Sequence, residues 1–278
     1  MASNLLKGGH HMVVHSRSRG PVDELVAAGA VSAPSPAEVA RQATIVITML
    51  PDTPDVEQVI AGPNGVLSAI RRDAVLVDMS SISPVATRRL ASEVAAKGAA
   101  MLDAPVSGGE IGAKNASLSI MVGGDAAAFA RVQPMLACIG NPERIVHIGE
   151  SGAGQICKIC NQVAIGGALA GVSEAFALAR KAGVDAARVR QALLGGFAAS
   201  RVLEVHGERM LTGNYAPGFR TKLYRKDLRI ANEAAATHAV AMPATALVTQ
   251  LVNALVASGG ADLDYSAIGT VIFELAKC

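Results

Sequence analysis

The sequence contains few aromatic residues and few charges. It has 278 residues with no tryptophan, and aromatic residues make up only 3%. Charged residues make up 17% and the formal net charge is +2, so nothing in the charge balance favours a nucleic acid or an anionic membrane surface as a partner. The 51% of hydrophobic residues can instead build a substantial core, in one large or two ordinary domains.

Cysteines are also few, and long uninterrupted apolar runs are absent. Four cysteines without the spacing of a small disulfide scaffold predict a reducing, cytoplasmic environment. Cys157 and Cys160 lie inside a predicted helix without a second pair, so we expect no metal site and no redox pair there. Residues 163–172 and 244–257 are too short or too interrupted to span a membrane, and the first residues lack the apolar segment of a signal peptide.

The first half of the chain alternates strand and helix patterns, which predicts βαβ units and a parallel sheet with helices on its faces. The predicted strands are residues 11–15, 44–49, 74–79, 99–102, 118–122 and 144–148. The predicted helices are residues 21–28, 54–60, 84–97 and 125–138.

The second half shows helix patterns only, separated by glycine and proline. The predicted helices are residues 155–182, 185–194, 200–211, 223–238, 244–258 and 265–276. We therefore predict an α/β domain over residues 1–150 and an all-α domain over residues 151–278. A helix begins at this junction, and ligand pockets occur preferentially at domain junctions.

The first of these helices places Lys158 and Asn161 three residues apart on one face. A lone charge in an otherwise apolar helix has to be solvated, paired or used in chemistry. The alternative to a functional lysine is one whose side chain extends from a buried helix to water.

Other candidate residues follow predicted strands. Ser107, Gly108 and Gly109 offer a hydroxyl and open backbone N–H groups that suit a carboxylate, although a tight turn alone would also explain the two glycines. Leu50-Pro51 and Ser80 come at the carboxyl ends of predicted parallel strands, where doubly wound sheets bind ligands.

Three segments, residues 103–124, 152–162 and 217–227, resemble the β-hydroxyacid dehydrogenase family, and the similarity covers nearly the whole chain. Residues 195–210 are similar to its 2-hydroxy-3-oxopropionate (tartronate semialdehyde) reductase subgroup. The Ser-Gly-Gly and Lys-x-x-Asn-Gln motifs are together specific for the family. Ala116 is a departure, because family members often have glycine there.

The resemblance implies an N-terminal Rossmann domain, a helical domain, and an active site in the cleft between them. It implies NAD(P)H-dependent reduction of 2-hydroxy-3-oxopropionate to glycerate, with Lys158 as general acid in reduction and general base in oxidation. Partial burial, which lowers the pKa of a lysine, suits this role, and related imine-reducing enzymes lack the lysine. The remaining implied residues are Ser107, Gly108 and Gly109 for the substrate carboxylate, Asn161 for its hydroxyl, Phe219 and Asp227 lining the pocket, and Leu50, Pro51, Ser80 and Lys226 on the cofactor side.

Two alternatives stay open. The substrate could be 3-hydroxyisobutyrate or a succinic semialdehyde-type compound instead. The chain could be a non-catalytic homologue that serves as an oligomer partner. The resemblance also implies a homodimer or a homotetramer, with subunit contacts made by the helical half, as in the family.

The family's first strand and its G-x-G-x-x-G turn, which bind the cofactor diphosphate, are missing from this sequence. Residues 1–10 align with the second half of the family's first helix, which Gly8-Gly9 would end, so about fifteen residues are absent. We expect a gap or an unpaired edge in the sheet. Either the true start lies upstream, which every intact downstream motif favours, or the chain is truncated and binds cofactor poorly.

The residues after the first predicted strand favour NADPH over NADH. Ser16 stands where an NAD-preferring enzyme usually has an acid for the ribose 2′-hydroxyl, and Arg17 and Arg19 follow. Arginine pairs well with phosphate. The alternative is a basic turn that faces only solvent.

Overall fold

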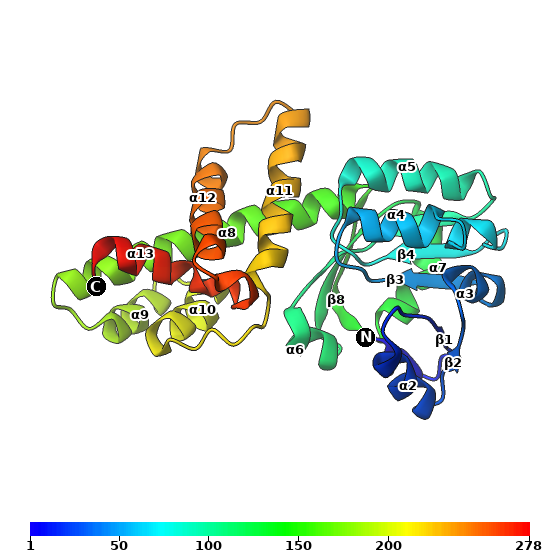
Figure 1. The fold of residues 1–278 in the computed structure, drawn as a ribbon, viewed down its shortest axis with the longest axis horizontal. Coiled ribbons are helices and arrows are strands. Elements are labelled where there is room, and N and C mark those ends of the chain that lie inside the picture. The colour runs from blue at the N-terminus through cyan, green and yellow to red at the C-terminus, as the bar shows by residue number, and fades with distance from the viewer. The chain divides into compact units, whose positions relative to one another are not determined.

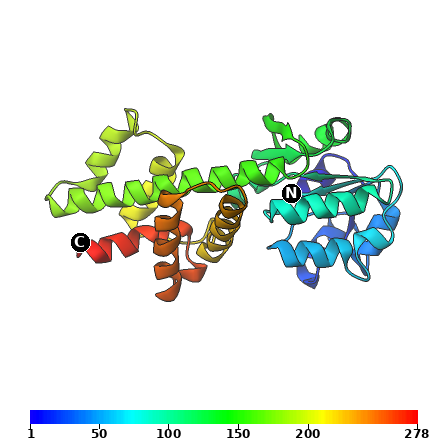
Figure 2. The ribbon, with the colours of Figure 1, turned by 90° about the horizontal axis from the view of Figure 1, so that it is seen from above.

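The computed structural model describes residues 1–278 and divides into two compact units, Met1–Lys158 and Ile159–Cys278. The division falls inside helix α8 (Ala153–Lys181), which is one unbroken helix (Figure 2). We call the first unit the Rossmann unit and the second the helical unit, and describe each by itself.

The Rossmann unit contains a six-stranded sheet in which β3, β4 and β5 are parallel neighbours (Figure 1). β7 pairs antiparallel with β5 and β6, and parallel with β8. The sheet is therefore mixed, where the sequence predicted a parallel one. The connection from Ser107 to Leu118 is shorter than the roughly dozen residues of a parallel crossover, so the chain reverses there. The strands are β3 (Ile45–Thr48), β4 (Val75–Asp78), β5 (Ala100–Asp103), β6 (Val106–Ser107), β7 (Leu118–Gly123) and β8 (Gly140–Gly149).

Two further strands form a separate parallel pair, β1 (Val13–Val14) and β2 (Val31–Ser32). β3 pairs only with β4, so it is an edge strand of the larger sheet. The expected interruption of the sheet is thus present between β1 and β3.

Helices cover both faces of the larger sheet. Successive side chains of a strand point to opposite faces, so a strand that is buried along its length needs a core on each side. In β4, which is buried along its whole length, Val75 and Val77 pack into one core with α7, while Leu76 packs into another with α4 and α5. The helices of this unit are α1 (Ala2–Lys7), α2 (Arg19–Ala27), α3 (Pro36–Gln42), α4 (Thr53–Ala61), η1 (Val66–Ser68), α5 (Pro84–Ala95), α6 (Gly109–Lys114) and α7 (Ala126–Leu136).

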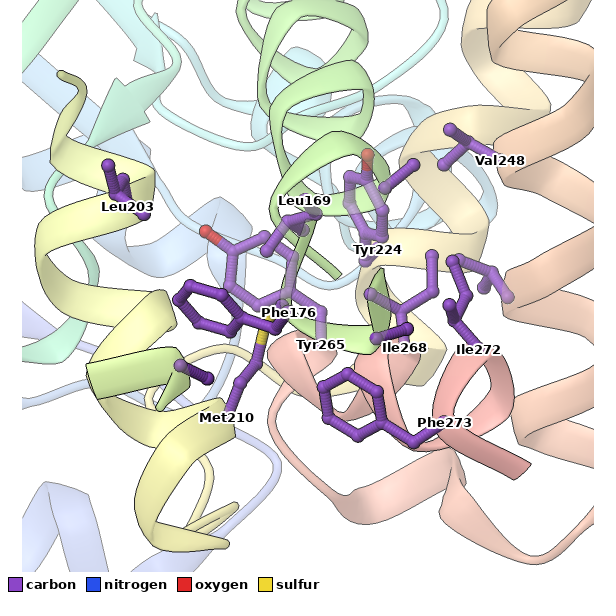
Figure 3. Packing of buried hydrophobic residues seen from close by; sticks show 14 of the residues in the cluster. Leu169, Phe176, Leu203, Met210, Tyr224, Val248, Tyr265, Ile268, Ile272 and Phe273 are labelled. Carbon is purple, nitrogen blue, oxygen red and sulfur yellow. The ribbon is translucent and has the colours of Figure 1, made fainter. Parts of the chain in front are cut away.

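The helical unit packs its helices around the part of α8 that follows Lys158. Figure 3 shows Phe176 and Leu169 of α8 among Met210, Tyr224, Tyr265 and Ile268, all of them buried. The other helices are α9 (Ala186–Leu194), α10 (Arg201–Thr212), α11 (Thr221–Thr237), α12 (Pro243–Ala257), η2 (Gly260–Asp262), η3 (Tyr265–Ala267) and α13 (Ile268–Ala276).

The sequence predicted every long element within a few residues but missed short ones, namely β2, α3, η1, β6, α6 and η2. For α3 a signal was present. Ser35 and Glu38 stand in the spacing of a capping box, and the Ser35 hydroxyl accepts a hydrogen bond from the Glu38 N–H (3.2 Å).

By length and composition alone, α8 could cross a membrane. This is weak evidence, because the buried central helix of a folded domain meets the same criterion.

Candidate functional site

The carboxyl ends of β3, β4 and β5 bring three polar side chains into register. Thr48 pairs with Asp78, and Asp78 pairs with Asp103. Asp78 and Asp103 are both buried. The strand ends that the sequence nominated for ligand binding therefore form one continuous edge, as expected for neighbouring parallel strands.

The structure brings together two of the predicted cofactor residues, Leu50 and Ser80. The backbone N–H of Leu50 donates to the Ser80 hydroxyl (2.9 Å), and that hydroxyl donates to Asp78 Oδ1 (2.6 Å). Thr48 Oγ1 donates to the same carboxylate oxygen (2.8 Å). The loop that contains Leu50 and Pro51 is thus tied to the end of β4.

Two buried residues hold the start of α8 against these strand ends. Asp103 accepts hydrogen bonds from the N–H groups of Gly152 and Gln155, both 2.8 Å long. The Gln155 side chain donates to the Ser80 carbonyl (2.8 Å) and accepts from the Ile82 N–H (3.1 Å). Polar contacts therefore connect the predicted cofactor side to the helix that carries Lys158.

Glycine is required at this junction by close packing. A Cβ on Gly154 would lie 2.3 Å from the Met121 carbonyl oxygen and 2.7 Å from that of Asp103. Only a residue without a side chain lets the first turn of α8 approach β5 and β7 so closely.

Burial changes the acidity of both strand-end carboxyls. It raises the pKa of Asp78 from 3.8 to about 6, although the hydrogen bonds from Ser80 and Thr48 lower it and the charge of Asp103 raises it. Burial also raises the pKa of Asp103, against the lowering effect of the Gly152 and Gln155 N–H groups. Asp78 Oδ2 is buried without a hydrogen-bond partner, which favours the protonated form of this carboxyl.

Lys158 lies near the start of α8, one turn after Gln155, and its side chain is only 9% exposed. This burial disfavours the alternative of a lysine that extends into solvent, because buried lysines are rare unless they are paired or used.

Ser107 ends β6, and Gly108 and Gly109 turn the chain into α6. Their φ angles, 133° and 62°, lie in the region that favours glycine. Both glycines are exposed. The two glycines therefore form a tight turn and also present exposed backbone, so the turn does not rule out a carboxylate site. Ala116, in the loop after α6, has φ 53°, which explains why glycine suits this position better.

Ser16 and Arg17 lie in the loop after β1. The Ser16 hydroxyl accepts from the Ser18 N–H (3.2 Å). Arg17 pairs with Asp55 of α4 (3.1 Å), while its side chain stays 80% exposed. An exposed ion pair of this kind contributes little stability, so the guanidinium could exchange this partner for another anion.

In the helical unit, Asn161 and Asp227 are joined through Gln162. Asn161 Nδ2 donates to Gln162 Oε1 (2.8 Å), and Gln162 Nε2 donates to Asp227 Oδ2. Lys226 Nζ lies 2.9 Å from Asp227 Oδ1, with both side chains largely buried. Three of the predicted residues, from α8 and α11, therefore belong to one polar network.

Phe219 belongs to a neighbouring aromatic cluster. Its ring meets Tyr265 edge-on at 5.4 Å, and Tyr265 meets Tyr224 at 5.1 Å. The Tyr224 hydroxyl donates to the Gln162 carbonyl (3.0 Å), which links this cluster to the polar network. Burial raises the pKa of Tyr224 and Tyr265 far above the usual range, so both remain neutral donors.

None of the residues that support these positions is among the predicted site residues, although Asp78 stands in the strand-end segment that the sequence singles out with Ser80. Gln162 and Asp103 stand inside the quoted motifs, so their place beside Asn161 and Ser107 was a usable signal. Asp264 and Tyr265, by contrast, lie far along the chain from the residues they contact. The supporting residues are Asp78, Asp103, Gln155, Gln162, Tyr224, Asp264 and Tyr265.

Two family models match most of the chain. Residues 1–149 match the NAD binding domain of 6-phosphogluconate dehydrogenase. Residues 152–272 match the model described as NAD-binding of NADP-dependent 3-hydroxyisobutyrate dehydrogenase. Both descriptions concern binding of a nicotinamide cofactor.

Relatives with similar sequence and fold extend over nearly the whole chain. The 2-hydroxy-3-oxopropionate reductase of Escherichia coli (strain K12) is 48% identical, over 96% of this chain and 91% of the relative. The 3-hydroxyisobutyrate dehydrogenase of Pseudomonas aeruginosa is 37% identical, over 96% and 92%. The structure of Mycobacterium tuberculosis 3-hydroxyisobutyrate dehydrogenase with L-serine has a TM-score of 0.89 at 31% identity, over 98% of this chain and 94% of that one. The chain therefore belongs to the β-hydroxyacid dehydrogenase family of NAD(P)-dependent enzymes.

Proposed function

We propose that this enzyme reduces 2-hydroxy-3-oxopropionate to glycerate, using NADPH in preference to NADH. The observation that carries the proposal is the buried Lys158 on a helix start that Asp103 and Gln155 anchor to the strand ends. The 48% identity to a reductase named for this substrate supports the choice of aldehyde.

Lys158 acts as the general acid in this proposal. The chemistry that a nicotinamide cofactor would supply, when bound, is a hydride for the aldehyde carbon, and negative charge would then develop on the aldehyde oxygen. The Lys158 ammonium stabilises this charge by a hydrogen bond and gives up a proton to form the alcohol. In the oxidative direction the neutral amine accepts that proton.

The other residues hold the substrate. The Ser107 hydroxyl and the N–H groups of Gly108 and Gly109 bind its carboxylate. The amide of Asn161 has donor and acceptor capacity beyond its bond to Gln162, and it binds the hydroxyl. Phe219 and Asp227 line the remaining side.

The strand-end residues fit a nicotinamide cofactor. Leu50, Pro51 and Ser80 follow adjacent parallel strands, where cofactors of doubly wound sheets bind. Lys226 is the fourth residue that we assign to cofactor binding. Ser16 and Arg17 would face the 2′-phosphate of NADPH, which is the basis for preferring this cofactor.

Steady-state kinetics with a panel of aldehydes tests the substrate. We expect kcat/KM to be higher for 2-hydroxy-3-oxopropionate than for succinic semialdehyde or for 2-methyl-3-oxopropionate, the aldehyde formed by oxidation of 3-hydroxyisobutyrate. A higher value for 2-methyl-3-oxopropionate would instead support the activity named for two of the relatives. Turnover of none of them by a chain that binds NADPH would support the non-catalytic alternative.

A further inference from the structure

Asp264 is a buried carboxylate that no part of the proposed reaction uses. Its side chain is 1% exposed, and it lies between η2 and η3 in the helical unit. Asp264 Oδ1 accepts from the N–H (3.1 Å) and the hydroxyl (2.6 Å) of Ser266. These bonds would account for a residue that only caps η3.

The second oxygen of Asp264 binds a different segment. Asp264 Oδ2 accepts from the N–H groups of Gly218 (3.0 Å) and Phe219 (3.1 Å), which precede α11. The chain is fixed in the reverse direction too, because the Tyr265 N–H donates to the Phe219 carbonyl (3.0 Å). Phe219 is therefore held at its backbone on both sides and at its ring by Tyr265.

Helix α10 supplies the groups that face this carboxylate. Arg209 Nη1 lies 3.6 Å from Asp264 Oδ2 and donates to the Ala216 carbonyl (2.6 Å). His206 Nδ1 lies 3.6 Å from Asp264 Oδ1, and His206 Nε2 is 3.0 Å from the Tyr265 hydroxyl. Burial lowers the pKa of His206, so Arg209 provides the positive charge opposite Asp264 at neutral pH.

This arrangement gives a role to residues 195–210, whose similarity to one subgroup of the family had no structural explanation. The segment ends in the part of α10 that carries His206 and Arg209. Both side chains face Asp264, the carboxylate that binds the Phe219 backbone. A change in α10 would therefore be transmitted to the position of that ring.

We propose that Asp264 is a positioning residue for substrate binding, which fixes Phe219 through its backbone with Arg209 as the charged partner. This inference rests on the proposed function, in which Phe219 contacts the substrate. Loss of the carboxylate is expected to loosen the Gly218-Phe219 segment and weaken substrate binding while the Rossmann unit keeps its affinity for the cofactor.

The experiment compares three variants of the full chain. Asp264→Asn removes the charge and half of the acceptor capacity, and we expect about a tenfold rise in KM for the aldehyde and in the Kd of glycerate, measured by calorimetry. The kcat value and the NADPH Kd should stay within about twofold. Ser266→Ala loses the hydroxyl hydrogen bond to Asp264 Oδ1 but keeps the backbone N–H bond to the same oxygen, and it spares Gly218 and Phe219. Asp262→Asn alters an exposed neighbour. Both variants should leave KM near the wild-type value.

A double-mutant cycle separates positioning from a structural role. In a Phe219→Ala background, Asp264→Asn should change KM by less than about twofold, because the ring it positions is gone. An equal fold-change in both backgrounds, or an unchanged KM in a folded Asp264→Asn variant, would overturn the proposal. If Asp264→Asn does not fold, Arg209→Met takes its place, with about a threefold rise in KM expected, again dependent on Phe219.

The controls also distinguish the two levels of inference. A wild-type chain that neither binds glycerate nor turns over the aldehyde would overturn the proposed function and the positioning role with it. A wild type that is active, beside an Asp264→Asn variant with the same KM, would overturn only the role of Asp264.

Discussion

Asp103 in the Rossmann unit and Asp264 in the helical unit both bind the backbone of a segment that carries a candidate site residue, but their surroundings differ. Each is 1% exposed, and each accepts hydrogen bonds from two backbone N–H groups of a segment that carries a candidate site residue. Asp103 holds the start of the Lys158 helix, and Asp264 holds Phe219. The comparison shows that a buried carboxylate can fix a functional segment by its main chain, whatever side chains that segment presents.

The two carboxylates differ in what balances their charge. Asp103 is stabilised by N–H groups at the start of α8, and burial raises its pKa. Asp264 faces Arg209 at 3.6 Å. Asp103 is therefore balanced by backbone N–H groups at a helix start, whereas Asp264 has a charged side chain opposite it in addition to its backbone contacts.

The largest expected effect comes from the residue that Asp103 helps to position. Lys158→Ala should lower kcat by at least about 10² while NADPH affinity is retained, because the alkoxide loses its proton donor. Lys181→Ala, which removes an exposed lysine at the far end of the same helix, should leave kcat unchanged. Near-normal turnover by Lys158→Ala would refute the assigned role.

The pH dependence of the free energy of unfolding tests how burial affects a carboxyl of the Rossmann unit, Asp78. The pKa of Asp78 is about 6 in the folded chain, against 3.8 ordinarily, so the folded state binds this proton more tightly. The resulting stabilisation is complete below about pH 4 and is lost as pH rises to about 6, by about 3 kcal/mol. Urea unfolding at several pH values should show a flatter profile for Asp78→Asn than for the wild type; parallel profiles would contradict the assignment.

Two glutamines allow a matched test, because the Gln155 side chain binds backbone groups whereas the Gln162 side chain binds other side chains. Gln155→Ala leaves the Ile82 N–H and the Ser80 carbonyl without a partner, and should lower the free energy of unfolding by about 2–3 kcal/mol. Gln162→Ala breaks contacts to Asn161 and Asp227, but Asp227 keeps its Lys226 partner, so about 1 kcal/mol is expected. A larger loss of unfolding free energy for Gln162→Ala than for Gln155→Ala, measured by denaturant unfolding, would contradict this difference between the two units.

The preference between NADPH and NADH tests the loop after β1, where Arg17 is exposed. Arg17→Ala should raise KM for NADPH about tenfold and leave KM for NADH nearly unchanged, because only NADPH offers a 2′-phosphate. Arg19→Ala is the control, since Arg19 pairs along its own helix with Asp23 (2.9 Å). Equal effects of Arg17→Ala on both cofactors would argue for a turn that faces only solvent.

The smallest expected effect concerns backbone strain. Ala116 has φ 53°, so Ala116→Gly should raise the free energy of unfolding by about 1 kcal/mol. Ala113→Gly, inside helix α6, should lower it by about 0.5–1 kcal/mol. Thermal unfolding of the two variants should therefore show shifts of opposite sign, and shifts of the same sign would show that strain at Ala116 is not the cause.

The sequence allowed the long elements to be predicted and candidate site residues to be singled out, because both depend on local patterns. Leu50, Ser80 and Lys158 follow from strand ends and from a charge on an apolar helix. The antiparallel pairing of β7 with β5 was missed because it depends on how a short connection reverses. Asp264 could not be found, since its partners Gly218 and Phe219 lie far from it in the chain and only the tertiary fold brings them within 3.1 Å.

Transfer of deuterium from NADPH that carries deuterium at both C4 positions of the nicotinamide ring tests the central claim most directly. After incubation of the wild-type chain with this NADPH and 2-hydroxy-3-oxopropionate, mass spectrometry should find deuterium on C3 of glycerate, at a rate that Lys158→Ala lowers by at least about 10². Glycerate without deuterium, or no glycerate while NADPH is bound, would contradict hydride transfer to the aldehyde as the reaction of this enzyme.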